Sequence, residues 1–208
     1  GFPNYPTGKL APGYRLSLYR REEVEGVVVH RVVLHPSHDR SSLGRTLNYL
    51  SFSLSALVFC LLQSHRYDLI YVYHPPITSG LAAALAGLLW HRPFVLEIQD
   101  LWPDSVAASG MTATGFLARL LDPMCRFVYQ RAALVLGQSE GMAALLVQRG
   151  VALERTDVFY NWADSTAAQA NGVHDLASLN FEGRFNFVYA GNLGAVQALE
   201  VLIKAAHS

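Results

Sequence analysis

The strongest constraint on the fold is an alternation of two kinds of apolar segment along the chain. Short runs rich in Val, Ile, Leu and aromatic residues are separated by longer runs rich in Ala and Leu. The short runs predict strands and the long runs predict helices, and their alternation is typical of βαβ units on a parallel sheet. Strands such as Leu-Ile-Tyr-Val-Tyr are continuously apolar, as expected where helices cover both faces of a sheet. We therefore predict an α/β fold with a Rossmann-like, doubly wound parallel sheet.

The pattern also predicts where the domains begin and end. The expected strands are 26–34, 68–73, 94–99, 133–137 and 156–160, and the expected helices are 43–63, 78–90, 114–131 and 140–149. A polar stretch over 163–183 follows, and then a strand at 185–190 and a helix at 196–207 restart the pattern. Because the chain opens on a Gly/Pro-rich loop, we expect residues 1–175 to be a domain that lacks its first strand. Residues 176–208 would be a linker and the truncated first βα unit of a second Rossmann-like domain.

Composition excludes several classes of protein. Hydrophobic residues make up 51% of the 208 residues, which excludes an intrinsically disordered chain. Sixteen basic and sixteen acidic residues balance, whereas a nucleic-acid-binding protein needs a basic surface. The two cysteines rule out a disulfide framework and indicate a reducing, cytoplasmic setting. The apolar segments 46–62 and 77–90 are shorter than the roughly 20 residues of a membrane span, so we expect both to be buried helices.

Polar and aromatic residues follow four of the predicted strands. They are Tyr73 and His74, then the segment Asp100–Asp104, then Gln138–Glu140, and finally Asn161 and Trp162. Ligands of parallel sheets bind outside the carboxyl ends of the strands, so these loops predict a binding site. Ordinary turn formation, for which Pro and Asp are well suited, is the alternative explanation.

The segment after the strand at 94–99 is the most informative of these loops. Glu97 and Gln99 alternate with apolar residues, which places polar groups on one face of a core strand. Asp100 is the candidate catalytic residue, and Trp102 offers a flat surface suited to a sugar ring. Asp104 is either a substrate-binding residue or the cap of a turn.

Two glycine-containing motifs suggest other chemistry. Gly191, Asn192 and Gly194 lie between a predicted strand and a helix, where backbone N–H groups bind phosphate, although a plain tight turn is an alternative. Gly137-Gln-Ser139-Glu-Gly141 matches the nucleophile elbow of serine hydrolases, with His174 and His207 downstream. Ser139 is also a natural helix N-cap. A serine hydrolase and a non-catalytic sugar- or nucleotide-binding module therefore stay as alternatives to a transferase.

Four motifs in order along the chain resemble one enzyme family. They are Gly1–Gly8, Glu-Ile-Gln-Asp-Leu-Trp-Pro-Asp over 97–104, Asn-Trp-Ala-Asp over 161–164, and Asn186–Gly194. Together they are similar to the retaining glycosyltransferases of family four, especially those of bacterial O-antigen and capsule assembly that handle fucosamine-type sugars.

The resemblance implies a GT-B enzyme of the hexosyltransferase type (EC 2.4) with two Rossmann-like domains. The N-terminal domain would bind a glycan acceptor, often lipid-linked, and the C-terminal domain a nucleotide-sugar donor, expected to be UDP-linked, without a metal. Asp100 would point into the cleft beside the donor sugar, with Tyr73, His74, Trp102, Asp104 and Asn161 binding substrate. Gly191, Asn192 and Gly194 would approach the pyrophosphate. Asn192 and Gln197 stand where the family usually has Arg and Lys, so the 208 residues alone are expected to be catalytically incomplete.

The same resemblance suggests a location in the cell. Residues 1–45 hold seven basic and four acidic groups with interleaved aromatic and Leu side chains. Such a segment is suited to anionic headgroups, although a solvated surface has the same composition. We therefore expect a cytoplasmic protein with peripheral contact to the inner face of the bacterial plasma membrane.

Overall fold

The computed structural model describes residues 1–4, 7–37, 42–105, 115–163, 181, 183, 185–191, 193 and 197–206. The chain divides into two compact units, Gly1–Tyr160 and Asn161–Ser208, and each is described by itself. The predicted domain boundary at residue 175 lies outside the described residues.

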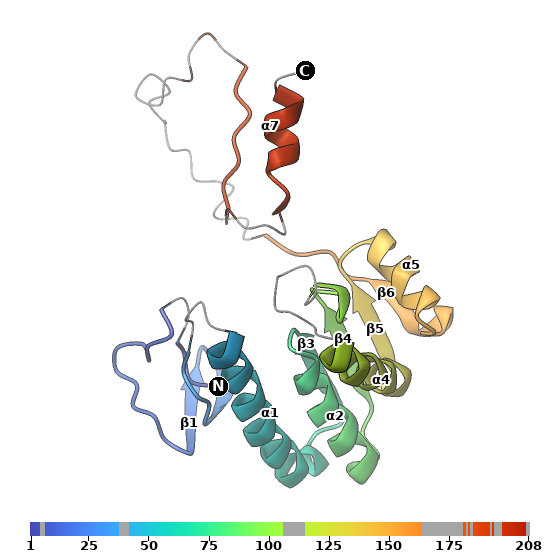
Figure 1. Ribbon diagram of the computed structural model, residues 1–208. Coiled ribbons are helices and arrows are strands. Elements are labelled where there is room, and N and C mark those ends of the chain that lie inside the picture. The colour runs from blue at the N-terminus through green and yellow to red at the C-terminus, as the bar shows by residue number, and fades with distance from the viewer. Residues whose placement is uncertain are drawn as a thin grey trace. The chain divides into compact units, whose positions relative to one another are not determined.

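A four-stranded parallel sheet forms the centre of the first unit (Figure 1). Its strands, in spatial order, are β3 (Ile70–His74), β4 (Phe94–Ile98), β5 (Leu134–Gly137) and β6 (Thr156–Val158). All three strand pairs are parallel, which confirms the predicted α/β class. Because the order runs in one direction, the reversal that defines a doubly wound sheet is not among the described strands.

The helices of this unit connect consecutive strands. They are α1 (Ser42–Gln63), α2 (Ile77–Trp90), α4 (Gly115–Arg131) and α5 (Glu140–Gln148), and short 3₁₀ turns lie at Ser64–Arg66 (η1) and Leu153–Arg155 (η2). Right-handed crossovers that advance in one direction place α2, α4 and α5 on the same face of the sheet. The core lies beneath them and includes the fully buried Ile77, Leu96, Ile98, Val128 and Val135.

Two glycines allow α2 to approach its neighbours closely. A Cβ at Gly80 would come within 2.7 Å of Val128 Cγ1, and a Cβ at Gly87 within 2.7 Å of the Arg92 carbonyl oxygen. The contact at Gly87 is with backbone, which has little freedom to move away. The small side chains of α2 therefore follow from packing rather than from helix propensity.

Gly87→Ala is expected to lower the free energy of unfolding by about 1–3 kcal/mol, because overpacking outweighs the gain in helix propensity. Gly141→Ala is the matched control, since a Cβ there meets only Ser139 Oγ at 3.9 Å. That variant should be as stable as the wild type or up to about 1 kcal/mol more stable. Urea denaturation of the two variants checks the prediction, and equal effects would contradict it.

One predicted strand lies in a different sheet from the one expected. The 26–34 prediction corresponds to β2 (Val27–Val32), which pairs antiparallel with β1 (Tyr19–Val24) in a separate two-stranded hairpin. The turn residues Glu25 and Gly26 have φ of 51° and 79°, as a two-residue hairpin turn of the primed type requires. The sequence Tyr-Arg-Arg-Glu-Glu-Val of β1 did not predict a strand because charged side chains dominate it. Arg31 of β2 forms an ion pair with Glu22 of β1 across this hairpin, and Arg20 of β1 pairs with the same carboxylate.

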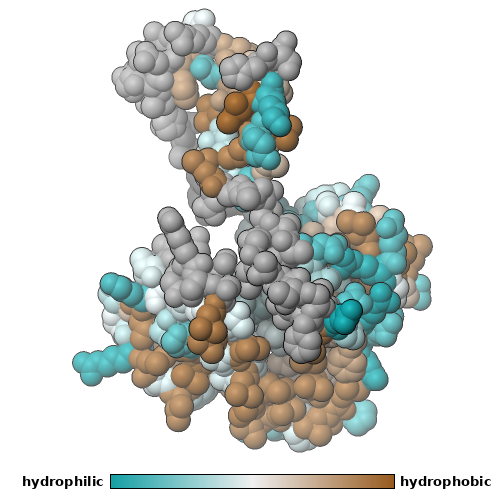
Figure 2. Space-filling view, in the orientation of Figure 1, coloured by the Kyte–Doolittle hydropathy of each residue, from teal (hydrophilic) through white to brown (hydrophobic). Residues whose placement is uncertain are grey.

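The expectation that helices 46–62 and 77–90 are buried is wrong for one face of each. Apolar side chains of α1 and α2 remain exposed and gather at the foot of the space-filling view (Figure 2). By length and composition, the segment Thr46–Arg66 could cross a membrane. The apolar side chains on the exposed face of α1 are therefore not explained by burial within this unit.

In the second unit the described residues contain one helix, α7 (Glu200–Ala206), within the predicted range 196–207. The predicted strand at 185–190 is wrong, because these residues adopt no regular secondary structure. A strand needs a paired neighbour for its backbone groups, and no strand is present among the described residues of this unit.

Candidate functional site

The carboxyl ends of the four parallel strands form a level edge of the sheet. His74, Ile98, Gly137 and Val158 stand opposite one another in register at the ends of β3 to β6. We call this edge and the loops that leave it the rim. The loops begin at Pro75, Gln99, Gln138 and Phe159, so the structure brings three of the four predicted loops together within the first unit. Asn161, predicted to bind substrate, begins the second unit and is not placed relative to the rim.

Backbone and side-chain hydrogen bonds tie neighbouring rim loops together. The Gln99 N–H donates to the His74 carbonyl oxygen at 3.0 Å. Gln138 Nε2 donates to the Gln99 carbonyl oxygen, which links the ends of β4 and β5. Asp100 follows directly, so its backbone leaves the sheet from a fixed position.

Asp100 is exposed at this position. Among the residues that the structure describes, its carboxylate has no hydrogen bond or ion pair. Fold stability does not require the Asp100 carboxylate to be left without a partner. A carboxylate that contacts substrate, in contrast, must be available to it. This geometry is compatible with the catalytic role that the sequence predicts for Asp100.

The predicted substrate-binding residues Tyr73 and His74 face opposite sides of the sheet. Successive side chains of a strand alternate, so Tyr73 lies exposed on one face while His74 lies on the face beneath the helices. His74 is 0% exposed, and its ring contacts the Trp102 ring edge-on at a centroid distance of 5.7 Å. Neither ring nitrogen has a hydrogen-bond partner among the described residues. Burial lowers the pKa of His74 from 6.5 to about 4, so the imidazole is neutral at pH 7.

Trp102 is also mostly buried, with 9% of its surface exposed. Besides His74, its ring contacts the ring of Tyr49 from α1 at 6.4 Å. The predicted flat surface for a sugar is therefore covered largely by protein in this structure. Contact between Trp102 and a substrate stays a prediction, and it would involve only the small part of the ring that is exposed.

Glu97 lies on the face of the sheet opposite to His74. It is the polar side chain on a core strand that the alternation of residues 96–99 predicted. It is 3% exposed and accepts hydrogen bonds from the Tyr71 hydroxyl and from Gln99 Nε2, the latter at 2.5 Å. Desolvation and the neighbouring Glu97 carboxylate raise the pKa of Tyr71 to about 12. These two hydrogen bonds account for the burial of the Glu97 carboxylate. Its structural role is to hold the Gln99 side chain in place.

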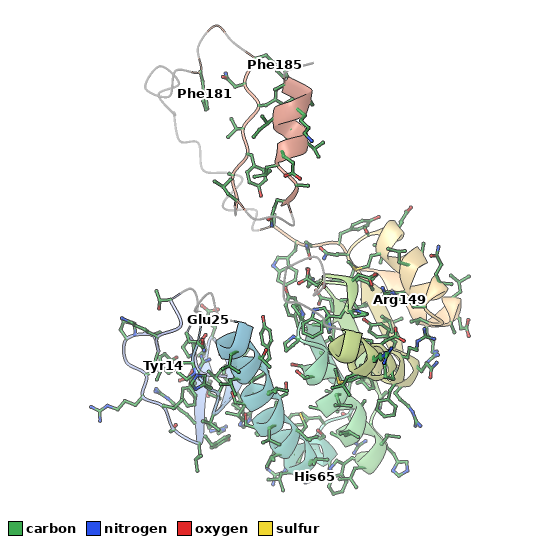
Figure 3. The ribbon with its side chains drawn as sticks, viewed as in Figure 1. Tyr14, Glu25, His65, Arg149, Phe181 and Phe185 are labelled. Carbon is green, nitrogen blue, oxygen red and sulfur yellow. The ribbon has the colours of Figure 1, made fainter. Side chains whose placement is uncertain are left out.

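Arg149, at the end of α5, holds the loop that carries Asp100 to Asp104 (Figure 3). Its guanidinium donates to the Trp102 carbonyl oxygen at 2.6 Å and forms an ion pair with Asp104. The Tyr129 hydroxyl donates to the same carbonyl oxygen at 3.3 Å. Asp104 therefore has a structural partner, and its side chain is still 70% exposed toward solvent. Neither Arg149 nor Tyr129 was predicted, because each lies on a helix far from the loop in sequence.

Arg149→Met is expected to lower the free energy of unfolding by about 1.5–3 kcal/mol, because charge-assisted hydrogen bonds to a partly buried carbonyl are lost. Arg126→Met is the matched control: it breaks the exposed ion pair with Asp122 on α4. That change should cost less than about 0.5 kcal/mol. Denaturation curves of both variants check the difference, and equal stability of the two would contradict the role of Arg149.

Ser139 serves as a helix cap. Its Oγ accepts a hydrogen bond from the Met142 N–H at 3.2 Å, and its φ and ψ are −157° and 159°. A nucleophile elbow requires a sharp, strained turn, whereas this backbone is extended. The observation does not support the hydrolase alternative; His174 and His207 lie outside the described residues.

The predicted phosphate-binding residues lie in the second unit. Gly191 occupies a bend, where a Cβ would come within 2.8 Å of the Tyr189 hydroxyl. Asn192 and Gly194 lie outside the described residues, so the geometry of this predicted site is not described. Within the described part of the chain, no three His, Cys, Asp or Glu side chains are grouped as metal ligands.

Comparison with known proteins finds similarity to a curated glycosyl transferase and to solved structures. WcaI of Escherichia coli (strain K12), named as a colanic acid biosynthesis glycosyl transferase, is 28% identical over 214 residues. The match covers 98% of this chain and 52% of WcaI, so the chain spans about half the length of this relative. Anabaena HepE in complex with UDP-glucose is 22% identical with a TM-score of 0.42, covering 60% of this chain and 29% of HepE. Its complex with UDP has the same identity and TM-score, with 58% and 29% covered.

A family model gives the assignment. The model of the glycosyl transferase 4-like domain matches residues 9–162, which include the hairpin, the parallel sheet and the rim. The chain therefore belongs to the glycosyl transferase 4-like family.

Proposed function

We propose that the full-length protein transfers a sugar from a UDP-linked donor to a lipid-linked glycan acceptor in the assembly of a bacterial surface polysaccharide. The observation that carries the proposal is the exposed Asp100 carboxylate on the rim, within the region that the family model matches. WcaI, the relative that covers nearly the whole chain, is named for the biosynthesis of such a polysaccharide. The rim would bind the acceptor, and the donor would be bound by the second unit together with residues outside these 208.

The proposed reaction is a front-face transfer with retention and without a metal. The bond between the anomeric carbon and the UDP oxygen breaks through an oxocarbenium-like transition state. The acceptor hydroxyl forms the new bond on the same face, and its proton passes to the departing diphosphate. Asp100 would orient the acceptor hydroxyl and stabilise positive charge on the sugar, which is electrostatic preorganisation. The partly buried hydrogen bonds from Gln138 to the Gln99 carbonyl oxygen and from Arg149 to the Trp102 carbonyl oxygen hold the backbone on either side of Asp100.

Titration calorimetry of the full-length protein with UDP, GDP and CMP, and with their sugars, tests the donor class. We expect saturable binding of UDP and a UDP-sugar, and no binding by residues 1–208 alone. Binding of none of these nucleotides would contradict a transferase, and saturable binding without turnover would favour the non-catalytic module.

The stereochemistry of the product tests the reaction type. Proton NMR of the first product should show the same anomeric configuration as the donor sugar. An inverted product would contradict the front-face mechanism while leaving sugar transfer intact. Turnover after exhaustive chelation tests whether a metal is needed.

A further inference from the structure

Two side-chain hydrogen bonds hold the backbone of the rim on either side of Asp100. Gln138 Nε2 donates to the Gln99 carbonyl oxygen, immediately before Asp100. Arg149 Nη1 donates to the Trp102 carbonyl oxygen at 2.6 Å, two residues after Asp100. Since the Asp100 carboxylate is exposed, the structure restrains the backbone of this segment and leaves its acidic group available.

Both donors belong to the same βα unit of the sheet. Gln138 directly follows β5, and Arg149 directly follows α5 (Figure 3). β5 lies between β4 and β6, and Leu146 attaches α5 to the core with none of its surface exposed. Ser139 Oγ caps α5 and thereby fixes the turn between strand and helix. Because β5 and α5 pack on each other, Gln138 and Arg149, which we call the clamp, keep a constant spacing.

The other polar groups of Gln99 are held from different directions. Its N–H donates to the His74 carbonyl oxygen at 3.0 Å, and its Nε2 donates to the Glu97 carboxylate at 2.5 Å. These two bonds attach residue 99 to β3 and β4 without any help from Gln138. The Gln138 donor adds the orientation of the planar peptide group between Gln99 and Asp100. That orientation sets the direction in which the Asp100 side chain leaves the backbone.

Fold stability gives little reason for the bond between Gln138 and Gln99. Both residues are partly exposed, so water can replace either partner in the folded protein. A group that stabilises charge during a reaction must, in contrast, be held in its working orientation beforehand. A displacement of about 1 Å at such a group can lower the rate by about 100-fold.

From these contacts we propose that Gln138 and Arg149 are positioning residues for sugar transfer. They do not contact substrate themselves. They hold the peptide groups on either side of Asp100, so that its carboxylate meets the acceptor hydroxyl in one orientation. The inference rests on the proposed function, because it assigns the clamp to the reaction that Asp100 serves.

Gln138→Met in the full-length protein is the main test. Methionine has nearly the length of glutamine but no N–H donor. We expect kcat to fall by about 10- to 100-fold, with KM for donor and acceptor within about twofold of the wild type. The urea midpoint should stay close to that of the wild type. Gln148→Met, the same change at an exposed residue of α5, is the matched control and should keep the wild-type kcat.

Gln138→Glu reports on the donor itself. An ionised carboxylate of the same size cannot donate to the Gln99 carbonyl oxygen, whereas a protonated carboxyl group can. The ratio of kcat in this variant to kcat in the wild type should therefore rise as the pH is lowered from about 8 to about 5. A Gln138 side chain that only fills space would give a ratio that does not change with pH, and this result would overturn the proposal.

A double variant shows whether the clamp acts through Asp100. In protein that already carries Asp100→Asn, Gln138→Met should lower kcat further by less than about twofold. Arg149→Met should show the same dependence on Asp100 when kcat is counted per folded molecule, because this change also lowers stability. Equal fold losses from Gln138→Met with and without Asp100→Asn would overturn the proposal.

The same variants separate the clamp from the proposed function. A large loss of kcat in Asp100→Asn together with wild-type kcat in Gln138→Met would overturn the clamp and leave the role of Asp100 intact. Wild-type kcat in Asp100→Asn would contradict both.

Discussion

Asp100→Asn in the full-length protein is expected to lower kcat/KM for sugar transfer by about 100- to 1,000-fold, the usual effect of removing one preorganised electrostatic group. Asparagine keeps the volume of the side chain but removes its negative charge. The stability should change by less than about 0.5 kcal/mol, because Asp100 is exposed. Steady-state kinetics together with urea denaturation separates the two effects.

Asp68→Asn is the matched control for Asp100→Asn. Asp68 is also an exposed Asp, but it precedes β3 and therefore lies at the opposite edge of the sheet from the rim. It should retain wild-type turnover. Near-normal activity of Asp100→Asn, or an equal loss in both variants, would contradict the assignment of Asp100. A change in KM without a change in kcat would indicate that Asp100 contributes uniform binding instead of transition-state stabilisation.

The second large effect concerns His74 and the stability of the fold in mild acid. The pKa of His74 is lowered from 6.5 to about 4 by burial. Between these two values the unfolded chain binds a proton that the folded protein does not, so stability decreases as pH falls through this window. Above pH 6.5 His74 is neutral in both states, and its titration does not lower the free energy of unfolding. By pH 4 its protonation in the unfolded chain lowers that free energy by about 3 kcal/mol.

Urea denaturation at pH 7, 6 and 5 measures this effect. His74→Phe removes the titrating group and keeps an aromatic ring against Trp102, so its stability should depend less on pH than that of the wild type. His91→Asn is the control, because His91 is exposed and has a φ of 52°, which asparagine tolerates. This control should keep the wild-type pH dependence. A wild-type protein equally stable at pH 7 and pH 5 would show that His74 has a partner or is hydrated.

The parallel sheet was predictable because its strands are continuously apolar and its helices are long. β3 to β6 and α1, α2, α4 and α5 all lie within a few residues of their predicted bounds. β1 was not predictable, since its pairing depends on the turn at Glu25 and Gly26 and on ion pairs that no periodicity reveals. The opposite error occurred at 185–190, where an apolar run predicted a strand and the described residues provide no neighbour for it.

The rim was predictable as a location but not as an arrangement. Strand ends followed by polar residues indicated the loops that carry Asp100 and Gln138, and the register of the sheet brings them together. The same pattern could not show that His74 is buried or that Asp104 pairs with Arg149, because both depend on helices distant in sequence. It also could not show that α1 keeps an exposed aliphatic face, since apolar composition alone does not distinguish burial from membrane contact.

Transfer of a radiolabelled sugar from a UDP-sugar to a lipid-linked acceptor by the full-length protein tests the central claim most directly. We predict label in the lipid fraction with the wild type and with Asp68→Asn, and about 100-fold less with Asp100→Asn. Label that stays on the nucleotide for every UDP-sugar, with a correctly folded wild-type protein, would contradict the claim that this chain belongs to an active sugar transferase.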